Sequence, residues 1–110
     1  MIEKLYKLEI FVPESHFGLV RKALLSVDSG LIGKYVHCMS WSRVNSSWCP
    51  LAGSHPFLGT EGILEEASEI KIEICCKEER LQEIVSIVKA VHPYEEACIN
   101  IIPMVDSLNL

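Results

Sequence analysis

The feature that most constrains the fold is a strand, helix, strand order that occurs twice along the chain. In the strand patterns apolar and polar side chains alternate, as expected for a half-buried strand, whereas in the helical patterns apolar residues recur every three or four positions. This order predicts an α+β fold, the ferredoxin-like split β-α-β arrangement, with two helices on one face of an antiparallel sheet. The strand patterns lie at 5–12, 35–42, 68–76 and 97–103, and the helical patterns at 13–27 and 77–91.

An irregular stretch at residues 43–66 connects the two halves. Its segment "GSHPFLGTEG" has three glycines and a proline and indicates a loop, and "SWCPLAG" before it predicts a short returning strand. Trp41 and Trp48 are then expected to pack across a hairpin, since aromatic cross-strand pairs stabilise sheets. A loop this long inside a compact domain is more often functional than accidental.

Composition excludes several classes of protein. The 110 residues predict one domain spanning 1–110, and the net charge of -5 without a lysine or arginine cluster argues against a nucleic-acid partner. No apolar run approaches the roughly 18 residues of a membrane span, and no signal peptide is visible, so we expect a cytoplasmic protein without a membrane partner. Five cysteines without a C-x-x-C spacing predict free thiols, with Cys75, Cys76 and Cys98 as small apolar side chains.

The segment "HPYEE" concentrates chemically active side chains after the second helical pattern. Pro93 stops a helix and keeps His92 extended, so much of the motif is explained as a helix end. Tyr94 is expected to bury its ring and to hydrogen-bond its hydroxyl. Extended geometry would send Glu95 and Glu96 to opposite sides, so that one of them reaches a ligand cleft. The alternatives left open are a structural turn and a binding site.

Two further groups are candidates for a site. In an extended strand Tyr35 and His37 share one face, and across a subunit interface they would join the "HPYEE" turn. Two imidazoles and a carboxylate, from His37, His92 and Glu95, would suit zinc or a similar divalent ion, although no H-x-x-x-H spacing supports this.

The loop supplies the remaining candidates, His55 and Phe57. Phe57 either anchors another chain or a ligand, or covers the core of its own subunit.

Apolar residues occur on both faces of the outer strand patterns, which predicts an oligomer. Leu5 and Phe11 in the first pattern, and Cys98 and Ile102 in the last, lie opposite the residues that the helices would cover. Another subunit would bury this second face, so we expect a homo-oligomer.

Four segments, "GLIGKYVHC", "PLAGSHPFLGTEG", "EIKIEI" and "AVHPYEEA", resemble the inserted domain of the NGG-interacting-factor family. The resemblance runs from about Lys7 to Pro103. It implies a domain related to CutA and PII-type proteins, with a ferredoxin-like fold and a trimeric assembly. Full-length members of that family are hexamers with a dinuclear metal centre, whose ligands lie in flanking segments that this sequence does not contain. The metal-centre activity is therefore not implied here, and the chain is interpreted as a free-standing version of the insert.

Catalysis has little support in the sequence. No G-x-S-x-G elbow, phosphate loop or zinc-protease motif is present. Strand alternation separates His37 from Cys38, and Glu95 from Glu96, so neither pair forms a coherent acid–base unit and a hydrolase is disfavoured. The function we expect is a small trimeric PII- or CutA-like binding or regulatory module, with no catalytic activity of its own and an unknown ligand. The alternative is a divalent-metal-binding protein that uses His37, His92 and Glu95, and no other cofactor is expected.

Overall fold

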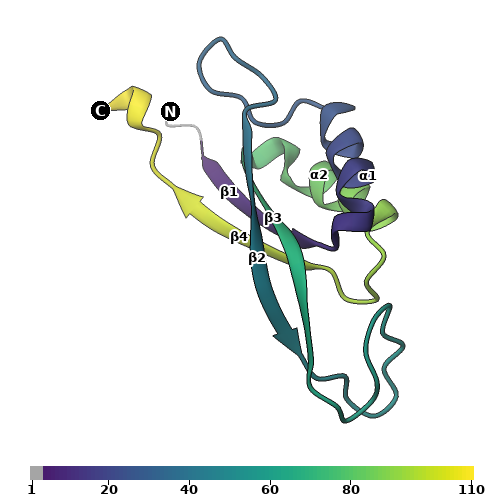
Figure 1. The fold of residues 1–110 in the computed structure, drawn as a ribbon. Coiled ribbons are helices and arrows are strands. Elements are labelled where there is room, and N and C mark those ends of the chain that lie inside the picture. The colour runs from purple at the N-terminus through teal and green to yellow at the C-terminus, as the bar shows by residue number, and fades with distance from the viewer. Residues whose placement is uncertain (1–3) are drawn as a thin grey trace.

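The computed structural model describes residues 4–110 and shows four strands in one antiparallel sheet with two helices on one face (Figure 1). The strand order is β2-β3-β1-β4, so the α+β, ferredoxin-like fold predicted from the sequence is confirmed. Within residues 4–110 no helix has the length and apolar character needed to cross a membrane. The elements are β1 (Leu5–Val12), α1 (Glu14–Leu25), β2 (Met39–Trp48), β3 (Glu65–Lys77), α2 (Glu78–Val91), β4 (Cys98–Met104) and the 3-10 turn η1 (Ser107–Asn109).

The hydrophobic core lies between the helices and the two central strands. Alternate residues of β1 and β3 point toward the helices, and each helix contributes two buried side chains spaced four residues apart. Burying one such aliphatic side chain contributes about 1.5–3 kcal/mol. The core residues are Leu8, Ile10, Val12, Val20, Leu24, Ile70, Ile72, Ile74, Cys76, Ile84 and Val88.

The opposite face of the sheet carries a ring of alternating charges at its centre. Lys7 Nζ lies 2.6 Å from Glu73 Oε1, and Lys71 Nζ lies 3.3 Å from Glu9 Oε2. Lys71 also lies over the Phe11 ring at 5.9 Å. Each lysine is flanked by carboxylates, which offset the repulsion between the two positive charges. Hydrogen bonding to Lys71 lowers the pKa of Glu9. This face is thus charged in the middle and apolar toward its ends.

The second strand begins later than the sequence predicted. It starts at Met39, not at Tyr35, because the chain first makes a tight turn in which Ile32 and Tyr35 form an isolated antiparallel bridge. His37 then adopts a left-handed backbone conformation with φ of 62°, which no extended strand accommodates. The expectation that Tyr35 and His37 share one strand face is therefore wrong.

Gly30 explains why the chain takes this route. Its φ is +65°, and a Cβ at this position would lie 2.4 Å from the carbonyl oxygen of Cys38. Only glycine permits this close approach of two backbone segments. Gly30 donates to the carbonyl of Cys75 at 2.8 Å and accepts from the amide of Cys38 at 2.9 Å, which joins the turn to β3.

The stretch expected to be irregular at residues 43–66 is shorter in the structure. β2 continues to Trp48, which pairs with Glu65 at the start of β3, so that the two strands form a long arm ending in a loop at residues 49–64 (Figure 1). The predicted returning strand at "SWCPLAG" is wrong. The two tryptophans lie on the same strand and do not pair, since Trp41 packs against Phe17 of α1 and Trp48 packs near Tyr94.

All five cysteines are free thiols. Cys76 is buried and Cys75 is half-buried, as predicted, and burial raises the pKa of Cys76 to about 11. Cys98 is exposed, so its predicted burial is wrong for a single chain. Its side chain lies on the face of the sheet that the helices leave uncovered.

Candidate functional site

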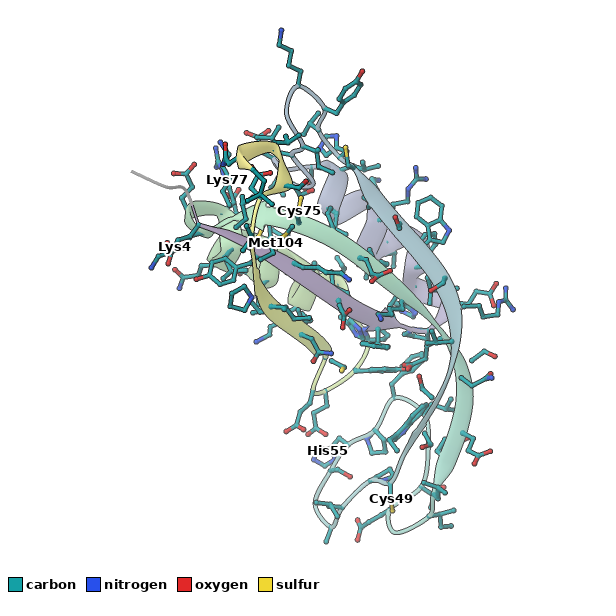
Figure 2. All side chains as sticks on the ribbon, turned by 90° about the vertical axis from the view of Figure 1, so that its left-hand side faces the viewer. Lys4, Cys49, His55, Cys75, Lys77 and Met104 are labelled. Atoms are coloured by element: carbon teal, nitrogen blue, oxygen red, sulfur yellow. The ribbon has the colours of Figure 1, made fainter. Side chains whose placement is uncertain are left out.

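The loop at residues 49–64 folds back onto the turn at residues 92–97, and together they form what we call the loop end of the molecule. The backbone amide of His55 donates to Glu95 Oε2 at 2.8 Å, and Trp48 Nε1 donates to the carbonyl of Leu58 at 3.0 Å. Figure 2 shows His55 and Cys49 at this end, with Cys75, Lys77 and Met104 at the opposite end. The contacts bring together two segments that the sequence analysis treated as separate candidates.

Tyr94 lies at the centre of a cluster of rings at the loop end. Its ring centroid is 4.9 Å from that of His92, 6.0 Å from that of Trp48 and 6.1 Å from that of Phe57. Phe57 also meets His16 of α1 edge-on at 5.4 Å. Such tilted and edge-to-face pairs are favourable by about 0.5–1.5 kcal/mol each, so the cluster fastens the loop to the body of the fold.

A buried carboxylate completes this cluster. The hydroxyl of Tyr94 donates to Glu69 Oε2 at 2.5 Å, and Glu69 is only 4% exposed. Burial, together with this hydrogen bond, raises the pKa of Tyr94, so the phenol keeps its proton. The pair satisfies a polar group that would be costly to bury alone.

His92 has a structural role in a single chain. Its Nε2 lies 2.7 Å from the carbonyl of Phe11, and its Nδ1 lies 3.2 Å from the amide of Tyr94. Because a carbonyl only accepts and an amide only donates, Nε2 carries the proton and Nδ1 is the acceptor. Burial lowers the pKa of His92, which also favours the neutral ring. The ring thus connects the end of α2 to β1.

The loop itself is closely packed. Pro50 is buried, and its carbonyl accepts from the amide of Gly62 at 2.8 Å. Gly59 has φ of +116°, and a Cβ there would lie 3.3 Å from both Pro50 Cγ and Trp48 Nε1. The hydroxyl of Ser54 donates to the carbonyl of Leu51 at 2.7 Å. These contacts hold the loop in one shape before any ligand arrives.

The loop end carries only negative charge. Residues 44–70 and 90–110 contain no lysine or arginine. A site formed by these residues therefore repels anions and attracts cations. The carboxylates on the arm and on the turn are Glu61, Glu65, Glu66, Glu69, Glu95 and Glu96.

Five of the predicted site residues meet at the loop end, and the others do not contribute contacts there. Tyr35 and His37 lie beyond the other end of β2, where His37 Nε2 lies 3.0 Å from the carbonyl of Val27. Glu96 is exposed beside the site. The residues that come together are His55, Phe57, His92, Tyr94 and Glu95.

The predicted metal ligands do not fit a metal ion within one chain. Among residues 4–110 no group of three histidine, cysteine, aspartate or glutamate side chains is arranged to hold one. His92 has both ring nitrogens engaged with the backbone, Glu95 binds the amide of His55, and His37 is at the other end of β2. His37 therefore does not meet His92 and Glu95 within one chain, and the predicted site, which joins them across a subunit interface, stays a prediction.

The chemistry available at the loop end favours binding over catalysis. Burial raises the pKa of Tyr94, so its phenol is not an activated nucleophile near neutral pH. His92 holds its proton on the nitrogen that faces Phe11, and no substrate reaches that nitrogen without displacing the strand. What the site offers is aromatic surface beside carboxylates.

Sequence reasoning missed two residues of this site and gave a third the wrong partner. Glu69 shares the strand face of Lys71 and Glu73, and only the fold shows that the turn buries it. His16 precedes the buried stretch of α1, and its contact with Phe57 spans much of the chain. Trp48 was noticed, but it was assigned to the wrong partner. The one signal available for these residues was strand periodicity, which gives the face of β3 on which Glu69 lies but not its contact with Tyr94.

We predict that His92 makes the fold sensitive to acid. Its folded-state pKa lies below the ordinary value of 6.5, so the unfolded chain binds the proton more readily. The stability that the neutral ring contributes is full above about pH 6.5 and is lost as the pH falls through the lowered pKa. Urea unfolding at several pH values should show this loss, and the His92→Gln variant should show a smaller one. An equal loss in His92→Gln and in the control His55→Gln would contradict the assignment.

We predict that Glu95 holds the loop closed. Replacing it in Glu95→Ala removes the hydrogen bond to the amide of His55, worth about 1 kcal/mol at an exposed position. Hydrogen exchange of the amides in residues 50–60 should then become roughly fivefold faster. Glu96→Ala is the matched control, because it removes the same charge from the neighbouring exposed residue. Equal acceleration in both variants would show that net charge, and not this bond, sets the loop's stability.

Comparison with known proteins shows what the chain is similar to. Residues 57–109 match the family model described as CutA1 divalent ion tolerance protein. A protein of Halalkalibacterium halodurans named GTP cyclohydrolase 1 type 2 homolog is 38% identical over 102 residues, which are 93% of this chain and 27% of that protein. The chain therefore spans only about a quarter of the length of the curated relatives it matches.

Solved structures agree with these matches. A Bacillus cereus protein related to NIF3 superposes with a TM-score of 0.81 and 31% identity, over 93% of this chain and 26% of that one. The Archaeoglobus fulgidus CutA has a TM-score of 0.66 and 24% identity, over 91% and 83% of the two chains. An Arabidopsis thaliana PII protein has a TM-score of 0.60 and 18% identity, over 93% and 78%. The last two show the shared fold alone.

The resemblance read from the four sequence segments is thus confirmed by sequence and by structure. The superpositions cover more than nine-tenths of this chain, so the likeness extends over the whole fold. The chain is thus similar to a segment of these longer relatives, and it has the fold of the CutA and PII proteins.

Proposed function

We propose that the protein is a homotrimeric binding or regulatory module without catalytic activity of its own. The observation that carries the proposal is the loop end, where a preorganised loop, a ring cluster and exposed carboxylates converge without an activated nucleophile. The names of the longer relatives refer to proteins of which this chain covers about a quarter, so a cyclohydrolase activity is not part of the proposal.

The uncovered face of the sheet supports an assembly of several chains. Lys7, Glu9, Lys71 and Glu73 already satisfy one another on this face, so covering them with a second chain leaves no charge unpaired. Apolar side chains flank the charges, and they gain most from being covered. The flanking residues on this face are Leu5, Phe11, Cys98, Ile102 and Met104.

The loop end would then lie beside a neighbouring subunit, as the ligand-binding part of the module. Tyr35 and His37, from the far end of a neighbouring chain, would meet the loop end across the subunit boundary. A PII neighbour is described as bound to citrate. The loop end of this chain has no lysine or arginine to hold such an anion, so the ligand we propose is neutral or cationic.

A second candidate is divalent-ion binding, which the description of the matching CutA1 family model favours. The ligands His37, His92 and Glu95 do not meet within one chain, so such a site requires two subunits. It also requires His92 to give up one of its two backbone partners.

The trimer is tested by a pair of adjacent substitutions on β4. Ile102 and Ile101 are 41% and 43% exposed, but Ile102 lies beside Lys7 on the uncovered face and Ile101 lies beside Leu8 on the helix face. We expect light scattering to give the unmodified chain a mass three times 12.4 kDa, and Ile102→Asp to dissociate it. Ile101→Asp should stay trimeric. An unmodified chain that is monomeric at about 50 µM would remove the trimer from the proposal.

Metal binding is tested by calorimetry with zinc. We expect any dissociation constant to be weaker than about 1 mM, because both ring nitrogens of His92 are engaged. Tighter binding that disappears in both His37→Ala and His92→Ala would instead establish the second candidate. His16→Ala is the control, because His16 is not one of the proposed ligands.

A further inference from the structure

We propose that the loop end binds a quaternary ammonium cation, in which carbon groups replace every hydrogen on the charged nitrogen. The surface that would hold it consists of the rings of Trp48, Phe57 and Tyr94, which we call the three-ring cluster. This inference rests on the proposed function, since it names a ligand class for the surface with which the module is proposed to bind. It depends on which parts of the rings the chain leaves unused and on the charge around them.

The polar atoms of the three-ring cluster are already engaged within the chain. Trp48 Nε1 donates to the carbonyl of Leu58 at 3.0 Å, and the hydroxyl of Tyr94 donates to Glu69 Oε2 at 2.5 Å. The ring of Phe57 has no polar atom. A ligand that needed hydrogen bonds from these rings would have to break one of these contacts. The rings therefore offer their faces and edges, which suits a cation that has no hydrogen to donate.

The three rings stay partly accessible because they do not lie flat on one another. The planes of Trp48 and Phe57 are inclined by 46° and 47° to that of Tyr94, with centroids 6.0 and 6.1 Å away. Phe57 is 50% exposed, and Trp48 and Tyr94 are half-buried. The hydrogen bond of Trp48 to the loop holds this arrangement before a ligand arrives, which reduces the entropy lost on binding.

Two other aromatic rings of the chain already carry one of its own cations. Arg21 Cζ lies 5.2 Å from the centroid of the Trp41 ring, and Lys71 Nζ lies 5.9 Å from that of the Phe11 ring. The face of an aromatic ring attracts a cation, and the attraction is greater where water is excluded. Residues 44–70 and 90–110, which supply the three-ring cluster, contain no lysine or arginine. Its own segments therefore bring no such cation to the cluster.

Carboxylates beside the three-ring cluster favour a cationic ligand. Glu95 Oε2 accepts from the amide of His55, which holds this exposed carboxylate next to the loop that carries Phe57. Glu96 is exposed as well, so an anion is repelled. An amine or a guanidinium would lose hydration on the rings without receiving hydrogen bonds from them. A quaternary ammonium has no such hydrogen bonds to lose, and it is the cation that fits.

The test compares choline with 3,3-dimethylbutan-1-ol, which has the same shape but a neutral carbon in place of the charged nitrogen. Amide NMR shifts of the 110-residue chain should change saturably at residues 49–64 and 92–97 as choline is added. We expect choline to bind about fivefold more tightly than the alcohol. Equal affinities would overturn this inference and leave the loop end as a site for a neutral ligand. No saturable shift with either probe at about 50 mM would also overturn it.

The contribution of the rings is tested by Phe57→Leu, which keeps an apolar side chain and removes one ring. This substitution should weaken choline binding about fivefold and leave the affinity for the alcohol nearly unchanged. Trp41→Leu is the matched control, because Trp41 is 48% exposed, close to the 50% of Phe57, but already carries Arg21 on its face. Equal effects of the two substitutions on choline binding would contradict the assignment of the three-ring cluster.

The contribution of charge is tested by Glu95→Gln, in which the side-chain oxygen can still accept from the amide of His55. It should weaken choline binding about twofold and leave binding of the alcohol unchanged. An equal loss for both probes would contradict this role of the carboxylate. The trimer is measured separately by light scattering, so a monomeric chain that binds choline as expected would remove the trimer from the proposed function and support this inference.

Discussion

The two hydrogen bonds of the His92 ring connect the parts of this structure that would otherwise be independent. One bond joins the end of α2 to the carbonyl of Phe11 in β1, and the other fixes the amide of Tyr94. The backbone direction that follows places the phenol of Tyr94 on Glu69 and the carboxylate of Glu95 under the loop. Because the ring is neutral and buried, this connection costs no desolvated charge. The position of the loop end therefore depends on the way in which α2 ends at His92.

The order of elements was predictable because it depends on local periodicity. The even residues of β1 and β3 and the four-residue spacing in each helix are visible without any tertiary information. The course of residues 30–38 was not, since it depends on a left-handed His37 and on the contact of Gly30 with Cys38. A run such as "YVHCMSWS" has strand-like composition throughout, and only the approach of another backbone segment shows where the strand begins.

The candidate site also has a part that could be predicted from the sequence and a part that could not. His92, Tyr94 and Glu95 were found because proline marks the helix end and unusual side chains follow it. Their contacts with His16, Trp48 and Glu69 were not predictable, since these residues come from three other elements and meet only after the sheet has formed. The metal hypothesis stays a prediction for a related reason: residue types that suit a metal are informative only when they lie within one coordination shell, and a single chain keeps His37 apart from His92 and Glu95.

Fold likeness and site chemistry lead to different conclusions for this chain. The sheet and helices are those of CutA and PII proteins, yet the loop end has carboxylates and rings where an anion site would need basic residues. The fold positions the loop and the turn, whereas the side chains that these two segments carry decide what the loop end can bind.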